Sequence, residues 1–257
     1  MKIATLNVNS IRARLDAVAG WLAEQRPDVL ALQETKVRDE AFPEEAFAKI
    51  GYHAVFRGEK TYNGVALLST LKPARVWNGF TDGGPADETR LIAAAIGPVH
   101  VVNTYVPQGR AMDHPMFTYK LEWFSRLRAW FDQHFSPRGK LLWVGDLNVA
   151  PEAMDIHNAE QQANHVCFHE SVRAAFAHAR DWGFVDVFRR LHPEGGQFTF
   201  FDYRTKDAVT RNLGWRVDHI LATAPLAARA RRCTIDRELR RQPKASDHTA
   251  VLAEFAV

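Results

Sequence analysis

Short runs of apolar residues recur along the whole chain and predict a large number of β-strands. Gly97-Pro98 separates two of these runs and is typical of a tight turn between antiparallel strands. Hairpins of this kind favour a largely antiparallel arrangement. The runs lie at 2–6, 29–32, 65–68, 91–96, 99–106, 141–144, 215–221 and 249–255.

Three longer segments show the spacing of an amphipathic helix. The first follows Ser10, a residue type that can cap it, and ends near Pro27. The second begins near Pro115 and ends before Gly139, and the third covers about 169–180. The apolar positions of the first two are Ile11, Leu15, Val18 and Leu22, and Phe117, Leu121, Phe124, Leu127 and Phe131.

Many short strands mixed with a few helical crossovers predict an α/β fold. Two mixed, mostly antiparallel sheets packed face to face, with helices on the outside, satisfy both patterns. Because no repeat, low-complexity segment or linker interrupts them, we expect one domain over residues 1–257.

The composition is that of a globular protein with a sizeable core, since 46% of the 257 residues are hydrophobic. Its apolar runs are far shorter than the ~20 residues that cross a bilayer, so we expect no membrane association. The N-terminus lacks a signal-peptide pattern, and the two cysteines, Cys167 and Cys233, have no disulfide or zinc spacing. We therefore expect a cytoplasmic location.

The net charge of +3 is unevenly distributed along the chain. Residues 203–244 carry 11 Lys and Arg against 4 Asp and Glu. A basic stripe of this kind fits a polyanionic partner, although a solvated face would have the same composition.

Three polar clusters lie at the ends of apolar runs that are far apart in the sequence. They occupy 32–36, 145–148 and 246–248. Carboxylates at strand ends are costly to bury unless something pairs them. Their oxygens are the ligands that hard divalent cations prefer, which favours a metal ion acting on a phosphate.

The first two clusters contain the strongest single candidates. Glu34 follows a buried strand and could bind the metal, although a lone Glu there is more often a solvated residue. On an extended strand, Asp146 and Asn148 would share one face, so that one activates a water and the other holds a phosphoryl oxygen. A turn is the alternative interpretation of the same residues.

The third cluster places a carboxylate beside an imidazole. On an extended chain Asp247 and His248 diverge and would serve different atoms. His248 could bind a phosphate oxygen while Asp218 orients its other nitrogen.

Further polar residues close neighbouring strands. Asn7 and Asn9 alternate with apolar residues, which puts both amides on one face. Tyr105 precedes a Pro/Gly turn and could donate to a phosphate oxygen, although a core or rim tyrosine is the simpler interpretation.

Taken together and in this order, these segments resemble the exonuclease III family of abasic-site endonucleases, in its bacterial form. One such motif alone has little specificity, whereas eight in register are highly specific. The matching segments are 6–12, 27–36, 62–66, 105–109, 145–148, 200–204, 212–218 and 246–248.

The resemblance implies a DNase I-like, four-layer αββα sandwich with its site at one end of the sheets. It also implies Mg²⁺, for which Mn²⁺ usually substitutes. Glu34 is similar to the principal metal ligand, with Asp247 and Asn9 near that ion; Asn9 stands where some relatives have Asp. Asp146 resembles the residue that activates the water, and Asn148 holds that water or stabilises the transition state, both beside the metal.

The remaining site residues also follow from the resemblance. Tyr105 and Asn7 would contact the phosphate or order the site, and the His248–Asp218 pair would neutralise phosphoryl oxygens. Arg110, Asn212 and the basic stretch would contact DNA. The residues that resemble a pocket for a base-free sugar are Phe200, Trp215 and Val217, with the small Cys167 in a loop beside them.

The implied function is a Mg²⁺-dependent repair phosphodiesterase acting on double-stranded DNA. It would incise 5′ to abasic sites, leaving a 3′-hydroxyl, and remove 3′ blocking groups or nucleotides. We expect a monomer working at the nucleoid. Two alternatives are a phosphatase for lipid or inositol phosphates, disfavoured by the segments at 200–204 and 212–218, and a nucleic-acid-binding protein without catalysis, disfavoured by the full set of polar site residues.

Overall fold

Twelve strands form two six-stranded sheets in a computed structural model that describes residues 1–257. The first sheet has the order β11 (Ala230–Ile235), β12 (Val251–Phe255), β1 (Lys2–Asn7), β2 (Val29–Gln33), β4 (Val65–Ser69), β3 (His53–Arg57). The second has the order β5 (Arg75–Asn78), β6 (Leu91–Ile96), β7 (Val99–Tyr105), β8 (Leu141–Asp146), β10 (Asp218–Thr223), β9 (Phe184–Asp186).

Both sheets are mixed and mostly antiparallel. The parallel pairs are β1–β2 and β7–β8, one in each sheet, and the chain crosses over through a helix in both cases. The expected hairpin at Gly97-Pro98 joins β6 to β7, with Ile96 opposite Val99. The sequence-based prediction of two mixed sheets is confirmed.

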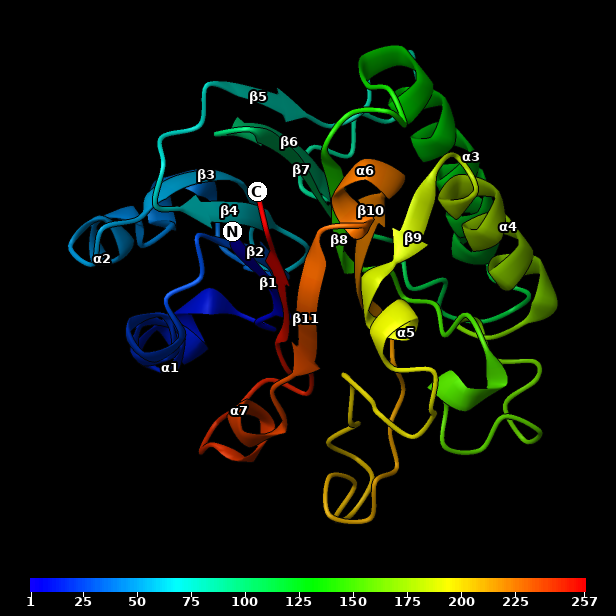
Figure 1. Cartoon of the computed structure of the whole chain (residues 1–257). Helices are drawn as coiled ribbons and strands as arrows, with labels where there is room; N and C mark the ends of the chain where they lie inside the picture. The colour runs from blue at the N-terminus through cyan, green and yellow to red at the C-terminus, as the bar shows by residue number, and fades with distance from the viewer.

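Helices cover the outer faces of both sheets, which gives the four-layer α/β sandwich (Figure 1). α1 (Ile11–Gln25) lies over the first sheet, and α3 (Pro115–His134) and α4 (Glu170–Arg180) lie over the second. These three confirm the predicted helices, and no helix has the length and apolar character needed to cross a membrane. The shorter helices are α2 (Glu44–Ala48), α5 (Val187–Leu191), α6 (Ala224–Ala227) and α7 (Arg237–Arg241), with 3₁₀ turns η1 (Asp39–Ala41) and η2 (Ala153–Asp155).

Alternation along the central strands divides the core into layers. In β2, Val29 and Ala31 face the second sheet, whereas Leu30 and Leu32 face α1. All four side chains are fully buried, so a one-residue slip in register would exchange the two layers without exposing an apolar group. Continuous apolar runs in the sequence therefore mark strands that are buried on both faces.

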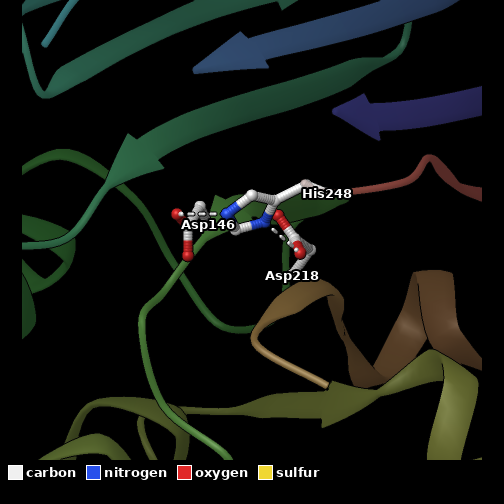
Figure 2. A group of neighbouring side chains, drawn as sticks. All are labelled: Asp146, Asp218 and His248. Carbon is white, nitrogen blue, oxygen red and sulfur yellow. Dashed lines mark hydrogen bonds and ion pairs between the residues drawn. The ribbon is translucent and has the colours of Figure 1, made fainter. Parts of the chain in front are cut away.

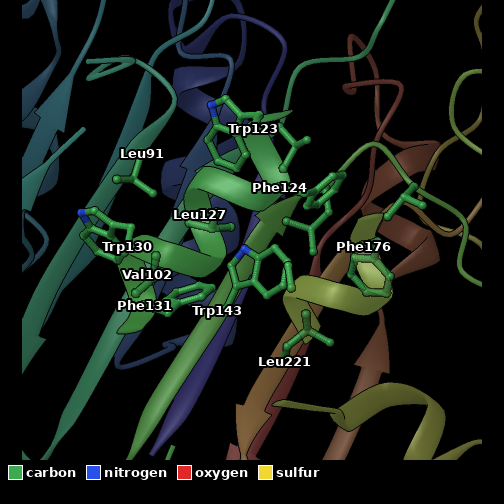
Figure 3. Close-up of a cluster of buried hydrophobic side chains, with 14 of the residues drawn as sticks. Leu91, Val102, Trp123, Phe124, Leu127, Trp130, Phe131, Trp143, Phe176 and Leu221 are labelled. Carbon is green, nitrogen blue, oxygen red and sulfur yellow. The ribbon is translucent and has the colours of Figure 1, made fainter. Parts of the chain in front are cut away.

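Aromatic residues of α3 form the core between the second sheet and its helices (Figure 3). Phe124 and Phe131 point onto Trp143 of β8, at ring-centroid distances of 6.4 and 5.5 Å. Each fully buried ring stabilises the fold by about 1.5–3 kcal/mol relative to an exposed one. Leu121, expected on this face, is only partly buried.

Two local expectations were wrong. Ser10 does not cap α1, because it has φ 91° and its side chain makes no cap hydrogen bond. Instead, the amides of Ser10 and Ile11 donate to the carbonyls of Glu34 and Thr35, which ties the start of α1 to the loop after β2. The strand expected at 215–221 begins only at Asp218, because Trp215 pairs with Phe200 outside the sheets.

The pairing directions explain why polar residues meet at one end of the sandwich. The carboxyl ends of parallel β1 and β2 lie at the same edge, and antiparallel β12 brings its amino end to that edge. In the second sheet, β7 and β8 end where β10 begins, with Tyr105 and Asp218 both opposite Asp146.

Candidate active site

Six segments converge at this end of the two sheets, and each contributes a polar side chain that the sequence singled out. The side chains are those of Asn7 at the end of β1, Glu34 after β2, Tyr105 at the end of β7, Asp146 at the end of β8, Asp218 at the start of β10, and Asp247 and His248 before β12. Most of them line a single cleft of about 400 Å³.

Asn7 connects the two sheets within this site. Its Nδ2 donates to Glu34 Oε1 at 2.8 Å and to Asp146 Oδ2 at 2.9 Å, while its Oδ1 accepts the backbone N–H of Asn9 at 3.0 Å. Since the amide is fully buried, it holds both carboxylates at a fixed separation.

Glu34 belongs to a chain of polar contacts on the rim of the cleft. Lys36 Nζ lies 2.7 Å from Glu34 Oε2 and donates to Asn9 Oδ1 at 2.6 Å, and Asn9 Nδ2 donates to Asp247 Oδ1 at 3.0 Å. Although burial raises the pKa of Glu34, the hydrogen bonds from Asn7 and Lys36 outweigh it and lower that pKa overall. The glutamate is therefore held as a carboxylate.

Asp146 and Asn148 form a turn, so the expectation of a shared strand face was wrong and the alternative was right. β8 ends at Asp146, and Asn148 has φ 50° with its backbone N–H donating to Asp146 Oδ1 at 3.0 Å. The turn still brings both side chains to the cleft. Burial is the main cause that raises the pKa of Asp146 to about 7, and the nearby Asp218 adds to it against the opposing effect of His248.

Gly145 is required for this strand end. It has φ 136°, and a Cβ at this position would lie 2.0 Å from the carbonyl oxygen of Thr104 on β7. The glycine therefore allows close approach of two backbones inside the sheet, just before the Asp146–Asn148 turn.

His248 lies between two carboxylates (Figure 2). Its Nδ1 is 2.8 Å from Asp218 Oδ2, and its Nε2 is 3.8 Å from Asp146 Oδ2. Burial alone lowers the pKa of His248, but Asp218 and Asp146 raise it to about 10. The imidazole is thus a cation at neutral pH, oriented by the partner that the sequence suggested.

Ser246 fixes the segment that carries this imidazole. Its Oγ donates to the carbonyl of Asn7 at 2.7 Å and accepts the backbone N–H of His248 at 3.2 Å. Asp247 and His248 diverge as expected: Asp247 contacts Asn9, whereas His248 contacts Asp218.

Two groups of side chains offer ligand atoms for a metal ion. The first is Asp146, Asp218 and His248, which each offer one ligand atom, and these three atoms lie within 4.8 Å of one another. However, a protonated His248 has no lone pair to give, and each of its nitrogens faces a carboxylate. The oxygens of Glu34, Asn9 and Asp247 fit a hard divalent cation better: those of Glu34 and Asn9 contact the Lys36 ammonium, and Asp247 accepts from Asn9.

The rest of the cleft holds the residues of the pocket that the family resemblance implied. Phe200, Trp215, Val217 and Cys167 all line it together with Glu34, Asp146, Asn148 and His248. Phe200 lies against His248 with ring centroids 4.9 Å apart, and Cys167 Sγ lies 3.9 Å from Asn148 Oδ1. Phe201, next to Phe200, is fully buried and belongs to the hydrophobic core. Tyr105 lines the same cleft, and burial, with Glu34 and Asp146 nearby, holds its pKa well above the ordinary value.

Lys120 of α3 is a buried residue that the sequence analysis missed. Its Nζ donates to the carbonyls of Asn148 at 2.6 Å, Val166 at 2.8 Å and Gln108 at 3.1 Å. The carbonyl of Gln108 belongs to the loop between β7 and α3, whereas those of Asn148 and Val166 belong to the loop between β8 and α4. Its position among the aromatic residues of α3 was the available signal, because a lysine on a core-facing helix stripe needs partners.

The loop between β8 and α4 supplies further cleft residues that the sequence analysis missed. They are His157, Gln162 and His165. No pattern in the sequence marks them, because the loop has no regular periodicity. They place polar groups on a wall that Phe200, Trp215 and Val217 alone would leave apolar.

Arg110 and Asn212, the two single residues expected to contact DNA, lie outside the cleft. Arg110 is exposed and next to Gly109, whereas Asn212 donates its Nδ2 to the carbonyl of Gly196 at 2.9 Å and so supports a loop. Within the basic stretch, Arg216 is buried between Asp155 and Asp186, with Nε 2.6 Å from Asp155 Oδ1. That arginine is structural, while Arg229, Arg231 and Arg241 are exposed.

Comparison with known proteins agrees with this architecture. Residues 4–248 match the endonuclease/exonuclease/phosphatase family. Exodeoxyribonuclease III of Haemophilus influenzae is 34% identical over 99% of this chain and its own full length. The structure of an AP endonuclease from Archaeoglobus fulgidus has 49% identity and a TM-score of 0.98, with full coverage of both chains. The 3′ phosphatase NExo from Neisseria, solved with a product DNA hairpin, has 39% identity and a TM-score of 0.95, again with full coverage of both.

A four-layer sandwich with this site at one end defines a member of the endonuclease/exonuclease/phosphatase family, and the chain belongs to it. Within that family it is an exonuclease III-like and AP endonuclease-like hydrolase acting on phosphodiester bonds of DNA. The resemblance inferred from the sequence is thereby confirmed, and a binding protein without catalysis is disfavoured.

Proposed function

We propose that the protein is a Mg²⁺-dependent DNA repair phosphodiesterase. It incises duplex DNA 5′ to abasic sites, leaving a 3′-hydroxyl, and removes 3′ blocking groups or nucleotides. The observation that carries the proposal is the continuity of the cleft, in which Phe200 packs against His248 while Trp215 and Val217 line the same cavity as Asp146.

The catalytic work is divided among buried groups with different charges. Asp146, with a pKa near 7, orients and deprotonates the attacking water. Asn148 holds that water or a phosphoryl oxygen, and the His248 cation stabilises negative charge that develops on the phosphate. Asp218 acts through His248 as a positioning residue.

Glu34, Asp247 and Asn9 would hold the Mg²⁺ ion, with Mn²⁺ able to substitute. When bound, the ion supplies Lewis-acid stabilisation of phosphate charge. Tyr105 and Asn7 lie beside these groups. Tyr105 donates to the phosphate, and the hydrogen bonds of Asn7 hold Glu34 and Asp146 at a fixed separation.

Substrate choice follows from the pocket beside the catalytic groups. A base-free sugar can leave the duplex stack at lower cost than a paired nucleotide, and an aromatic-lined pocket receives it. Cys167 is small and buried at this wall, so it leaves room for the sugar. Arg110 and exposed arginines of the basic stretch would contact DNA phosphates.

The relatives support DNA rather than lipid or inositol phosphates as substrate, since the named activities are exodeoxyribonuclease, AP endonuclease and 3′ phosphatase.

The direct experiment compares cleavage of a duplex oligonucleotide containing one abasic site with phosphate release from an inositol phosphate. Cleavage restricted to the abasic duplex, abolished by EDTA and restored by Mg²⁺, is the expected result. Selective release from the inositol phosphate would replace the proposal by its main alternative.

We also propose that the protein works as a monomer in the cytoplasm, as the sequence led us to expect; residues of a single chain supply the catalytic groups named above. Light scattering of the purified protein should give the 29.1 kDa mass of one chain.

A further inference from the structure

His165 lines the wall of the cleft beside the aromatic pocket. We propose that His165 is a specificity-determining residue whose Nε2–H donates a hydrogen bond to the C1 hydroxyl of a cyclic abasic sugar. The inference rests on the proposed incision at abasic sites. It extends that proposal by naming the substrate group that the cleft recognises.

The tautomer of His165 follows from its backbone contact. Nδ1 accepts the backbone N–H of Cys167 at 3.1 Å, so this nitrogen carries no proton. The ring is then neutral, and its single proton lies on Nε2. Burial, assisted by the positive charge of Lys120, lowers the pKa of His165 and keeps the ring in this form at neutral pH.

The donor is available to a ligand. Nε2 of His165 makes no hydrogen bond within the protein and is not among the buried atoms that lack a partner. The side chain is half-buried in the cleft wall. An N–H in this position faces solvent until a substrate arrives, so it can exchange a water for a substrate oxygen.

The ring is held in place by packing. It lies against Trp215 with ring centroids 4.5 Å apart and an interplanar angle of 47°. Trp215 is itself part of the pocket for the base-free sugar. The donor therefore lies next to the surface against which that sugar packs.

The backbone around His165 is also fixed. Its N–H donates to the carbonyl of Gln162 at 2.9 Å, and its carbonyl accepts from Phe168 and His169 at 2.8 Å each. The carbonyl of the next residue, Val166, accepts a hydrogen bond from the buried Lys120 ammonium at 2.8 Å. A donor fixed before binding loses little freedom when the substrate enters.

The C1 hydroxyl distinguishes an abasic sugar from other residues of DNA. A nucleotide carries its base at C1, and the tetrahydrofuran analogue carries only hydrogen. A site that bonds a substrate hydroxyl discriminates against the analogue that lacks it. One neutral, partly solvated hydrogen bond corresponds to a preference of about 3- to 10-fold.

The test measures single-turnover kcat/KM on two duplexes that differ only in an abasic site or a tetrahydrofuran at the same position. The wild type should prefer the natural abasic site about 3- to 10-fold. His165→Asn keeps an acceptor near Nδ1 but has no group at Nε2, so the ratio of its kcat/KM values on the two duplexes should fall to about 1. His165→Phe keeps the ring over Trp215 without a donor and should also lose the preference.

His165→Gln places an amide N–H near the position of Nε2 and should retain part of the preference. The exposed His53→Asn variant is the matched control and should keep the wild-type ratio. The proposal is overturned if the wild type does not discriminate, or if His165→Asn and His165→Phe both keep the wild-type ratio. Failure of the proposed function differs visibly, because the wild type would then cleave neither duplex.

Discussion

His248 Nδ1 lies 2.8 Å from Asp218 Oδ2, and both side chains are buried at the end of the cleft. This contact determines which groups are charged when DNA arrives. With its pKa raised to about 10 against the effect of burial, His248 is a fixed cation beside the place where phosphate charge develops.

Replacing Asp218 by Asn should remove that charge while retaining the shape of the site. The imidazole would then lose its main stabilising partner, so burial would lower its pKa and the ring would be neutral. We expect kcat on an abasic duplex to fall on the order of 10²–10⁴-fold, by analogy with removal of the orienting carboxylate from a catalytic triad. NMR titration of His248 in both proteins provides the measurement.

The same variant has a defined signature in stability. The folded pKa of His248, about 10, lies above the unfolded value of about 6.5. Its contribution to the free energy of unfolding is therefore fully present below pH ~6.5 and is lost as pH rises through ~10. The difference between wild type and Asp218→Asn in urea unfolding should shrink over that window; a difference that grows with pH would contradict the assignment.

Glu34→Gln tests which group of side chains holds the metal. An amide lacks the charge that a hard cation prefers, so Mn²⁺ affinity measured by electron paramagnetic resonance should fall at least about 10-fold. His248→Asn is the comparison, and it should leave the affinity within about 3-fold of wild type. If His248→Asn lowered the Mn²⁺ affinity and Glu34→Gln did not, the ion would lie among Asp146, Asp218 and His248.

Lys120→Met should weaken both the fold and the cleft. Methionine fills a similar volume but leaves the carbonyls of Gln108, Asn148 and Val166 without their donor. A cost of about 2 kcal/mol in the free energy of unfolding is expected from such unpaired groups. Urea denaturation provides the measurement, with the exposed Lys72→Met as control. Equal stability of the two variants would mean that the two loops do not depend on Lys120.

Cys167→Phe tests the space that the pocket leaves for a sugar. Cys167 is buried against Asn148, so a larger ring must project into the cleft. An obstruction costing about 1–3 kcal/mol lowers kcat/KM for abasic incision about 5- to 150-fold. Cys167→Ala should keep near wild-type incision, and the account of the pocket fails if the Phe variant does so as well.

The fold could be predicted largely because its strands are buried on both faces. Continuous apolar runs such as 141–144 have few alternatives once turn residues bound them. The local backbone geometry was harder to predict from the sequence. Ser10 is of a residue type that often caps helices, but its backbone has a loop conformation and is anchored to Glu34. The residue types of Asp146 and Asn148 are compatible with both a turn and a strand end, so the sequence could not decide between them.

In the candidate site, too, some residues could be predicted from the sequence and others could not. Glu34, Asp146 and His248 could be found because each lies at the end of a recognisable strand. The position of Lys120 on the apolar stripe of α3 marks it as buried, but its three carbonyl partners lie in loops, and His165 depends on its contact with Trp215. Such contacts leave no periodic trace in a single sequence.

The central claim is that Asp146 activates the water that attacks the phosphodiester. Single-turnover cleavage of a duplex with one abasic site by Asp146→Asn, at saturating Mg²⁺, tests it most directly. The account predicts that the rate falls at least about 10³-fold while the variant still binds the duplex and melts near the wild-type temperature. Cleavage within about 10-fold of wild type would contradict it.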